Sequence, residues 1–376
     1  MKRQILGLVA VLPAISVGTA AQNLATSLNR IEDGFVRMSF AAREGVCGNG
    51  GGITTWRTND AHWEPDCEPG PVRVVIERRA GDVEDIDTHV GGRWREHADV
   101  IDLGEVPAQE AAEYLISLAR HSDEDVAKDA VGAAALADVP RLWTDMMAMA
   151  RDESFGLAVR KTALFWSGHL GDESVVGMLV GFIRADVHPD LRESAVFALS
   201  QQGSESAASA LQDIAEDSGE VSTLRERAIF WLGQRRTESH EYLRELYQSI
   251  GDPELKERII FAVSQRATDE DWEWLIERAA SGSESIELRK KAMFWAGQSR
   301  HEMSDLIDLY DRLESRELKE NLVFVYSQRR HDDAALDKLF EIARQEGDTQ
   351  LRGKAIFWLG QSRDPRVIQF LAELIG

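Results

Sequence analysis

The chain has 376 residues, of which 43% are hydrophobic and 29% charged, a composition typical of folded proteins rather than disordered ones. Acidic residues outnumber basic ones by 65 to 43, so the net formal charge is -22. A field of that sign repels nucleic acid and anionic lipid, which argues against both as binding partners.

The first 21 residues have the pattern of a secretory signal peptide. Lys2 and Arg3 form a charged start, residues 5–17 are an apolar run, and residues 18–21 are small and suited to cleavage. A membrane anchor is the alternative, but an apolar run of this length that contains Pro13 is too short to span a bilayer comfortably. We therefore expect a secreted or periplasmic protein with no membrane span after cleavage of the signal.

Residues 22–106 read as a small β-rich module. Residues 35–40 and 72–78 have strand-like composition, and a turn at residues 80–82 leads into a further β-rich run at 83–90, which predicts a hairpin. Pro107 ends this module, because proline suits the first turn of the helix that follows.

Cys47 and Cys67 are the two cysteines of the chain, and secretion would place them in an oxidising compartment. A disulfide between them would close a glycine-rich loop and stabilise the module by about 3 kcal/mol in the chain-entropy model. A metal site with His62, Glu64 or Asp66 is the alternative, but the chain lacks a Cys-x-x-Cys pair. We predict the disulfide and expect no metal or other cofactor.

From residue 107 to 376 the chain repeats a phrase built on phenylalanine. Four copies read Phe-Trp-x-Gly, and three read Phe-Ala-x-Ser or Phe-Val-x-Ser. The phenylalanines are spaced by 32, 33, 31, 33, 30 and 33 residues. This period is typical of stacked helical pairs. The seven are Phe165, Phe197, Phe230, Phe261, Phe294, Phe324 and Phe357.

Each phrase lies in the second helix of a pair, and an earlier, degenerate copy with Gly132 in the Phe place brings the expected number of pairs to about eight. The residue seven places after each Phe is followed by an acid or by proline. This pattern favours the start of a helix, so we expect the next helix to begin there. These predicted starts are Asp172, Ser204, Thr237, Thr268, His301, His331 and Asp364.

Large and small residues alternate between successive phrases. A Trp beside a Gly in one phrase is expected to fit against Ala198, Ala262 or Val325 in the next. We interpret Phe and Trp as a packing seam between pairs, with a row of ligand-stacking rings as the alternative.

The phrase Leu-Arg-x-x-Ala-x-x-x-Leu-Gly-Gln, seen at residues 224–234, resembles HEAT repeats, in particular the bacterial type found in phycobilisome lyase subunits. The resemblance covers about residues 108–376. It implies a right-handed α-α superhelix whose second helices line the concave face, and it usually implies protein binding or scaffolding.

Two enzyme families built on this repeat provide alternatives. Deoxyhypusine hydroxylase holds di-iron with His-Glu pairs near the start of second helices, whereas His240-Glu241 and His301-Glu302 lie elsewhere and at non-equivalent places. The hydroxylase interpretation therefore fails on register. Bilin lyase activity shares the repeat, but the sequence identifies no chromophore pocket. Signatures of serine hydrolases, zinc proteases and phosphate-binding loops are absent from the sequence.

Three repeated polar positions are candidates for partner binding, each with a structural alternative. A basic residue follows the Leu, or Val159, that lies six residues before each Phe. Instead of binding a partner, these basic side chains could pair with loop carboxylates of adjacent repeats. A glutamine ends most phrases and can instead satisfy helix carbonyls. Arginines follow the glutamines and suit helix C-termini. The residues we nominate are Arg160, Arg192, Arg225, Arg289, Arg352, Gln234, Gln298, Gln361, Arg300 and Arg363.

The sequence thus predicts a non-catalytic, monomeric solenoid that binds a protein or peptide on its concave face. The alternatives are an enzyme or cofactor-binding protein on the same scaffold, like a bilin lyase or a metal-dependent hydroxylase, or a structural component of the cell envelope. The β module is expected to cap the first repeats or to add a second binding surface.

Overall fold

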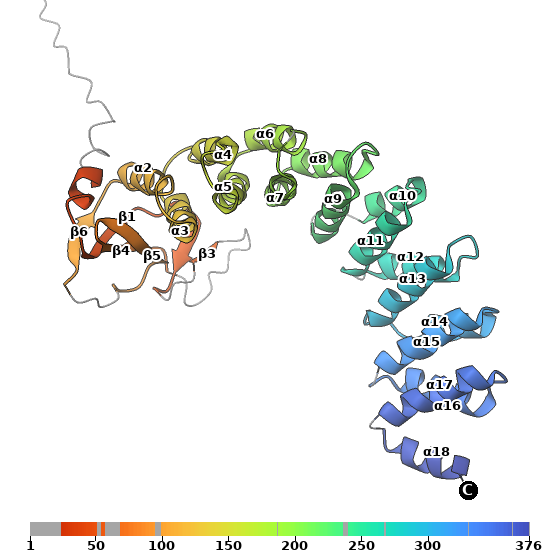
Figure 1. The fold of residues 1–376 in the computed structure, drawn as a ribbon. Coiled ribbons are helices and arrows are strands. Elements are labelled where there is room, and N and C mark those ends of the chain that lie inside the picture. The colour runs from red at the N-terminus through yellow and green to blue at the C-terminus, as the bar shows by residue number, and fades with distance from the viewer. Residues whose placement is uncertain are drawn as a thin grey trace, which may run out of the picture. The chain divides into compact units, whose positions relative to one another are not determined.

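A computed structural model describes residues 24–50, 54–56, 68–94, 99–185, 187–235, 240–266, 268–329, 331–362 and 364–375. The chain is mainly helical and begins with a small β-sheet, as expected. It divides into two compact units, Met1–Gln202 and Gly203–Gly376. Strands give way to helices between Glu105 and Ala108, but the first unit combines the sheet with the helices that follow it (Figure 1).

The sheet of the first unit has four strands in the order β5-β4-β1-β6. β1 is antiparallel to β4 and parallel to β6, and β2 and β3 form a separate antiparallel pair. The strands are β1 (Gly34–Phe40), β2 (Val46–Gly48), β3 (Thr54–Trp56), β4 (Val72–Arg79), β5 (Asp82–Val90) and β6 (Ile101–Glu105).

β4 and β5 form the hairpin that the sequence predicts. Its turn residues Ala80 and Gly81 both have positive φ, 52° and 90°. Positive φ at both central residues is typical of a type I′ turn, whose twist matches that of the two flanking strands. Alternate residues of β1 and β4, such as Met38 and Val74, are paired and buried. Helix α3 contacts β5 and so connects the module to the repeats.

Within the described residues, α2 to α17 form eight consecutive pairs, and α18 follows them. The first unit contains α2 (Ala108–Leu118), α3 (Glu124–Ala135), α4 (Trp143–Arg151), α5 (Leu157–Leu170), α6 (Ser174–Ile183) and α7 (Pro189–Ser200). The second unit contains α8 (Glu205–Glu216), α9 (Ser222–Gln234), α10 (Glu241–Ser249), α11 (Pro253–Ser264), α12 (Asp269–Ala280), α13 (Ile286–Gln298), α14 (Ser304–Arg312), α15 (Arg316–Gln328), α16 (Asp333–Gln345), α17 (Thr349–Gln361) and α18 (Arg366–Ile375).

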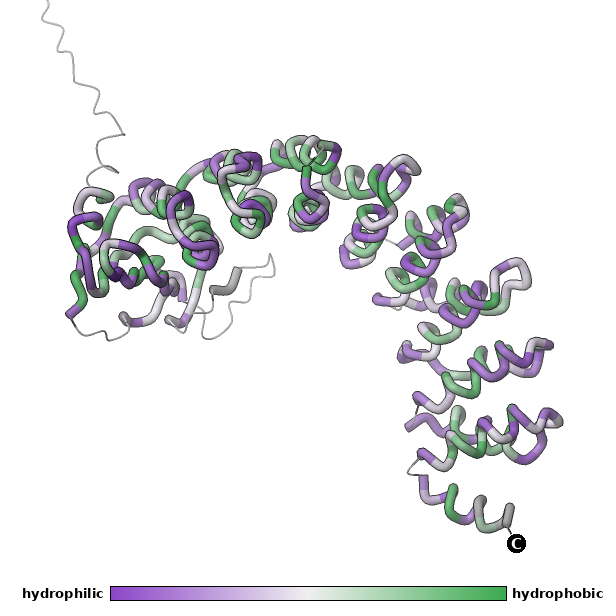
Figure 2. The backbone as a smooth tube through the Cα atoms, in the orientation of Figure 1, coloured by the Kyte–Doolittle hydropathy of each residue, from purple (hydrophilic) through white to green (hydrophobic). Residues whose placement is uncertain are grey.

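Even-numbered helices from α2 to α16 are the first helices of the pairs, and odd-numbered helices from α3 to α17 are the second helices. Within each unit, second helices of neighbouring pairs pack along one another, whereas first helices approach their neighbours much less. Hydrophobic and hydrophilic stretches alternate along the helices (Figure 2). In α9 the buried residues include Ala228, Ile229 and Leu232, which lie two and one before and two after the Phe of the phrase.

The predicted helix starts are correct where a cap side chain faces a free backbone N–H. Ser204 accepts a hydrogen bond from the N–H of Ala207, and Thr268 accepts one from that of Asp271. Four predicted starts are displaced. α16 is capped by Asp332 rather than His331, and α14 begins at Ser304, three residues after His301. α6 begins at Ser174 and α18 at Arg366, each two residues after the predicted Asp172 and Asp364. Thr237 lies outside the described residues.

The glycine of the Phe-Trp phrase permits the close approach that the sequence predicts. A Cβ on Gly233 would lie 2.7 Å from the Cβ of Ala262 in the next second helix, and one on Gly168 would lie 2.7 Å from that of Ala198. A Cβ on Gly297 would collide with Cγ1 of Val325. Each glycine therefore meets the small or β-branched residue that follows the next Phe.

The Phe and Trp rings contact one another between neighbouring pairs, as the packing prediction has it, but they are not fully buried there. The core is filled by the residues around them, such as Ile229 and Ile260, while Phe230, Trp231 and Phe261 are half-exposed. The residues next to each Phe already face the core, and a helix can turn only one side toward the core. The rings therefore lie at the outer edge of the second helices.

The predicted signal peptide falls on residues that lie outside those the structure describes. Over the described residues, no helix is long and apolar enough to cross a membrane. Cys47 is buried in β2, but Cys67 is also outside the described residues. The Cys47–Cys67 bond therefore stays a prediction.

The disulfide can be tested by intact-mass measurement of the secreted protein without reductant. The mass should be lower than that of the reduced chain by two hydrogens, and Cys47→Ser should abolish the difference. Recovery of free thiols at both cysteines in the unreduced protein would contradict the bond.

Candidate functional site

A continuous series of aromatic rings runs across the second helices of the second unit. Ring centroids are 6.4 Å apart for Phe230 and Phe261, and 5.0 Å apart for Phe261 and Trp295. The series continues with the same spacing to α17. We call this set the aromatic row. In spatial order it comprises Trp231, Phe230, Phe261, Trp295, Phe294, Phe324, Trp358 and Phe357.

The aromatic row combines two kinds of ring contact. Phenylalanines of neighbouring helices are nearly parallel, with interplanar angles of 8° for Phe230–Phe261 and 9° for Phe294–Phe324. Tryptophans meet the neighbouring ring at a steep angle, 60° for Phe261–Trp295. The rings are half-exposed, and Phe357 is 55% exposed. Rings held by one another but open to solvent on one side offer a stacking surface for a flat ligand.

Charge is separated between the two faces of the second unit. The first helices α8, α10, α12, α14 and α16 carry sixteen acidic and five basic residues. The second helices α9, α11, α13, α15 and α17 carry six acidic and eleven basic residues. Five of these basic residues, Arg225, Lys256, Arg289, Lys319 and Arg352, lie against the first helices of their own pairs. The other six basic residues balance the six acidic ones, so the aromatic row lies on a side of mixed charge that is less acidic than the first helices. An anionic ligand is repelled less there than elsewhere on this acidic protein.

Ion pairs accompany the aromatic row from one second helix to the next. Nε of Arg258 lies 2.8 Å from Oε2 of Glu226, and Nζ of Lys291 lies 2.6 Å from Oε1 of Glu257. Hydrogen bonds from Lys290 to the carboxylates of Glu287 and Glu317 hold the pKa of Lys290 above its ordinary value. Exposed pairs of this kind contribute little stability, so their cations can exchange to a ligand at low cost.

A pocket of about 180 Å³ opens between α9 and α11 at one end of the aromatic row. It combines the two parallel rings with two guanidinium groups and one carboxylate. Its lining residues are Thr223, Glu226, Arg227, Phe230, Arg258 and Phe261. A flat ligand with a carboxylate would find here both a ring surface and an arginine.

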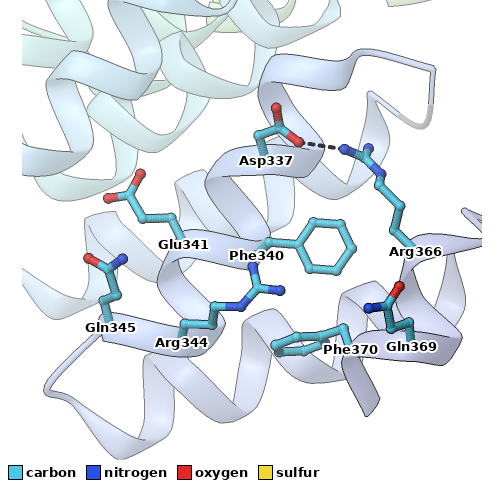
Figure 3. Close-up of a pocket in the computed structure, with 8 residues that line it drawn as sticks. All are labelled: Asp337, Phe340, Glu341, Arg344, Gln345, Arg366, Gln369 and Phe370. Atoms are coloured by element: carbon cyan, nitrogen blue, oxygen red, sulfur yellow. Dashed lines mark hydrogen bonds and ion pairs between the residues drawn. The ribbon is translucent and has the colours of Figure 1, made fainter. Parts of the chain in front are cut away.

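A larger pocket, of about 400 Å³, lies between α16 and α18 (Figure 3). The guanidinium of Arg344 lies over the buried rings of Phe340 and Phe370, at 5.5 and 4.8 Å from their centroids. Nη1 of Arg366 lies 2.7 Å from Oδ1 of Asp337. Its charged groups thus already interact with the protein itself, and the pocket lies apart from the aromatic row.

The basic residues that follow the Leu of each phrase face backbone carbonyls of their own pair rather than loop carboxylates. Nε of Arg160, Arg225 and Arg289 donates to the last turn of the preceding first helix, over 2.9, 3.0 and 2.9 Å. Arg192 and Arg352 make the same kind of bond. They satisfy carbonyls that the helix leaves without partners. Their role in partner binding stays a prediction.

The other nominated residues lie at the ends of the second helices. Gln234, Gln298 and Gln361 are exposed, and among the described residues they make no side-chain hydrogen bond. Arg300 is also exposed, and Arg363 lies outside the described residues. The structure does not bring these side chains together into a pocket, and their role stays a prediction.

A buried polar network links α10 to α12 on the first-helix side. Nδ1 of His240 lies 3.0 Å from Oδ2 of Asp271, and Nε2 lies 3.3 Å from the carbonyl oxygen of Gly233. His240 and Asp271 are only 4% and 2% exposed. His240 and Asp271 both lie ten residues after the Phe of their phrase, but the residue type at this place varies along the array, so the pattern does not single out the pair.

Asp271 is surrounded by donors. Nη1 of Arg244 donates to its carboxylate over 2.9 Å, and Oγ1 of Thr268 over 2.8 Å. Burial alone would raise the pKa of this carboxyl, but the bonds from His240 and Thr268 and the charge of Arg244 hold it below its ordinary value. The network therefore stabilises the link between two pairs as long as Asp271 is ionised.

The two His-Glu pairs lie in different surroundings, as their register predicts. Nε2 of His301 lies 3.0 Å from Oδ1 of Asp269, and its ring stacks on Trp272. Among the residues that the structure describes, no group of three or more His, Cys, Asp or Glu is placed to hold a metal ion.

Comparison with known proteins agrees with the repeat fold. A family model described as PBS lyase HEAT-like repeat matches residues 191–217 and 351–376. The chain is thus a HEAT-repeat protein, and it carries repeats of the PBS lyase type. The family predicted from the Leu-Arg phrase is confirmed. No curated protein matches the chain.

Two solved structures are similar to parts of the chain. Human deoxyhypusine hydroxylase in complex with glycerol is 20% identical, with a TM-score of 0.29, over 61% of this chain and 88% of that one. The complex of CpcE and CpcF of phycocyanin lyase from Nostoc sp. PCC7120 is 16% identical, with a TM-score of 0.31, over 66% of this chain and 94% of that one. At these identities and TM-scores, neither structure supports a statement about this chain.

The comparisons correct the main functional prediction. We expected a non-catalytic scaffold that binds a protein or peptide on its concave face. The repeats instead match a family model whose description names a lyase. This match favours the alternative, a solenoid-based enzyme or cofactor-binding protein.

The buried network makes a testable prediction. Asp271→Asn should lower the free energy of unfolding by about 3 kcal/mol, because His240 and Arg244 would lose their buried carboxylate. Since the pKa of Asp271 is depressed, its contribution is present above the unfolded-state pKa and is lost as pH falls through the folded-state pKa. Urea unfolding across the acid range measures both effects.

Asp269→Asn is the matched control for this experiment. The Asp269 side chain is 95% exposed on the same helical turn, so its removal should change stability by less than about 0.5 kcal/mol. Equal losses in the two variants, or an acid limb unchanged by Asp271→Asn, would contradict the assignment.

Proposed function

We propose that the chain is a HEAT-repeat protein of the lyase type that binds a flat, conjugated ligand with carboxylate groups on its aromatic row. An open-chain tetrapyrrole is the ligand class that the lyase name of the repeat family suggests. The observation that carries the proposal is the aromatic row itself, a continuous and half-exposed series of rings on the second helices, which are less acidic than the first helices.

The chemistry of the aromatic row supports this ligand class. Stacking on aromatic side chains contributes about 1–3 kcal/mol for each planar ring and tolerates variation in its substituents. Arg258 lines the pocket at one end, and Lys291 lies farther along the same face, so carboxylates of a long ligand can pair with either. A conjugated chain of several linked rings fits an extended row better than a deep, closed pocket does.

The proposal includes a second protein subunit. The phycocyanin lyase structure is a complex of two subunits, CpcE and CpcF, and this chain is similar to 94% of one chain in it. We propose that this chain also acts with a protein partner, and that the partner supplies groups for the chemical step.

Ligand binding can be measured with biliverdin, an open-chain tetrapyrrole that carries two carboxylates. Bound biliverdin should quench the tryptophan fluorescence of the protein, and the absorption of biliverdin should shift on binding. Trp295→Ala should weaken binding by about tenfold, since it removes one stacking ring from the middle of the aromatic row.

Two controls make the result specific. Trp274→Phe alters a buried tryptophan of α12 that packs on Tyr247 away from the row, and it should leave binding unchanged. Biliverdin dimethyl ester lacks the carboxylates and should bind more weakly. Equal affinity for wild type and Trp295→Ala would overturn the proposal.

We also propose that the protein is exported, on the strength of the signal-like residues 1–21. N-terminal sequencing of the protein from periplasm or medium should begin shortly after residue 21. Recovery of the chain from the cytoplasm with Lys2 and Arg3 still present would contradict export.

A further inference from the structure

Two kinds of joint alternate between successive second helices. We call a joint closed where a Phe-Trp helix is followed by a Phe-Ala or Phe-Val helix, and open where the order is reversed. In the second unit, α9/α11 and α13/α15 are closed joints. The joints α11/α13 and α15/α17 are open, and their helices approach each other less closely.

At closed joints, the glycine of one helix lies directly against a side chain of the next second helix. At α9/α11, Gly233 receives the Cβ of Ala262, and at α13/α15, Gly297 receives Val325. The residue five places after the second Phe then reaches back across the joint. Arg266 donates to the carbonyl oxygen of Arg235 over 3.3 Å, and Arg329 donates to that of His301 over 3.0 Å.

The first unit repeats the closed arrangement at α5/α7. Gly168 lies against Ala198, and Gln202, again five places after the Phe, donates to the carbonyl oxygen of Gly171 over 3.2 Å. Three closed joints therefore share the same two devices. One is a glycine against which the next helix packs, and the other is a side chain that donates a hydrogen bond to a backbone carbonyl of the preceding pair.

Open joints lack both devices. The place of the reaching donor is taken by Ser299 and Ser362, and Ser299 instead donates to the carbonyl oxygen of Ala296 in its own helix. On the second-helix side, each of these joints is crossed by a ring contact of the aromatic row and an exposed lysine ion pair. The ion pairs are Lys291–Glu257 and Lys354–Glu320. At α15/α17, Arg316 also donates to Oε1 of Gln350 over 2.6 Å.

On their first-helix side, the open joints hold buried polar groups. The His240–Asp271–Arg244 network lies at α10/α12. At α14/α16, Nζ of the buried Lys338 lies 2.8 Å from Oδ1 of Asp311. Short, directional bonds on one side and weak, exposed contacts on the other are the geometry of a hinge, with its pivot among the first helices.

We propose that the second unit moves as rigid blocks of two pairs, α8–α11 and α12–α15, which open and close at α11/α13 and α15/α17. Opening separates Phe261 from Trp295 and Phe324 from Trp358, while the parallel phenylalanine pairs stay fixed. The hinges thus change the spacing of the aromatic row at two tryptophans. This proposal goes beyond ligand binding and is tested without a ligand.

Native-state hydrogen exchange on the full mature chain tests the blocks. Amides of α9 and α11 should lose protection together, and those of α13 and α15 should do so as a separate group. Gly233→Ala places a Cβ against Ala262 and should speed exchange in α9 and α11 at least fivefold, with α13 and α15 changed less than twofold.

Gly360→Ala is the matched control, because this glycine occupies the same place in a Phe-Trp phrase but has nothing within 4 Å of an added Cβ. It should leave exchange in both blocks unchanged. If Gly233→Ala does not fold, Gly297→Ala is the milder variant, since its Cβ meets only the rotatable side chain of Val325 and a more distant leucine. It should affect α13 and α15 alone.

The result decides between two outcomes. Loss of protection confined to the altered block supports the hinges. Loss that spreads equally across α11/α13, or that proceeds one helix at a time in the unaltered protein, overturns the proposal.

Discussion

Two neighbouring helices can lie in close contact only where one of them lacks a side chain at the crossing point. In this chain that condition is met by the glycines of the first three Phe-Trp phrases, Gly168, Gly233 and Gly297, each of which receives the residue after the next Phe. The position of the glycine fixes the rotation of the helix about its axis, because the bare side must face the neighbour. The orientation of every other residue in the phrase follows from that rotation.

The aromatic row is one consequence of this rotation. Once Gly233 faces Ala262, the residues next to Phe230 fill the core and Phe230 itself lies at the outer edge. Another consequence is the position of the Arg225 side chain, which lies against the carbonyl oxygen of Ala215 and joins the two helices of its pair. One small residue thus sets both the packing of a pair and the surface that the pair presents.

Much of this architecture can be predicted from the sequence, because it depends on residues at regular spacing. The period predicts the pairs, alternation predicts the strands, and the small residues predict the glycine contacts. Exposure of Phe261 and Trp295 is not predictable in the same way, since spacing shows which residues share a side of a helix but not whether a further layer covers it. The excess of basic residues on second helices is visible in the sequence once the helices are assigned.

The polar links between repeats are the least predictable part. His240 and Asp271 are 31 residues apart and lie at the same place in their repeats, ten residues after the Phe. The residue type at that place varies along the array, so spacing alone does not predict that this His and this Asp form a bond. The starts of α14 and α16 differ from prediction for a related reason. A helix begins where a side chain reaches a free N–H, and Asp332 does this better than His331, which precedes it.

The alternation of joints also constrains how a chain of this kind can change in length. The phenylalanines of successive Phe-Trp phrases are 65, 64 and 63 residues apart, so the true repeat contains two pairs. Deleting one pair would bring two helices of the same type together, with a tryptophan where the glycine needs a small residue. Deleting two adjacent pairs would preserve every contact type. Duplication and loss are therefore tolerated in steps of two pairs, and arrays that descend from this one should differ from it by even numbers of pairs.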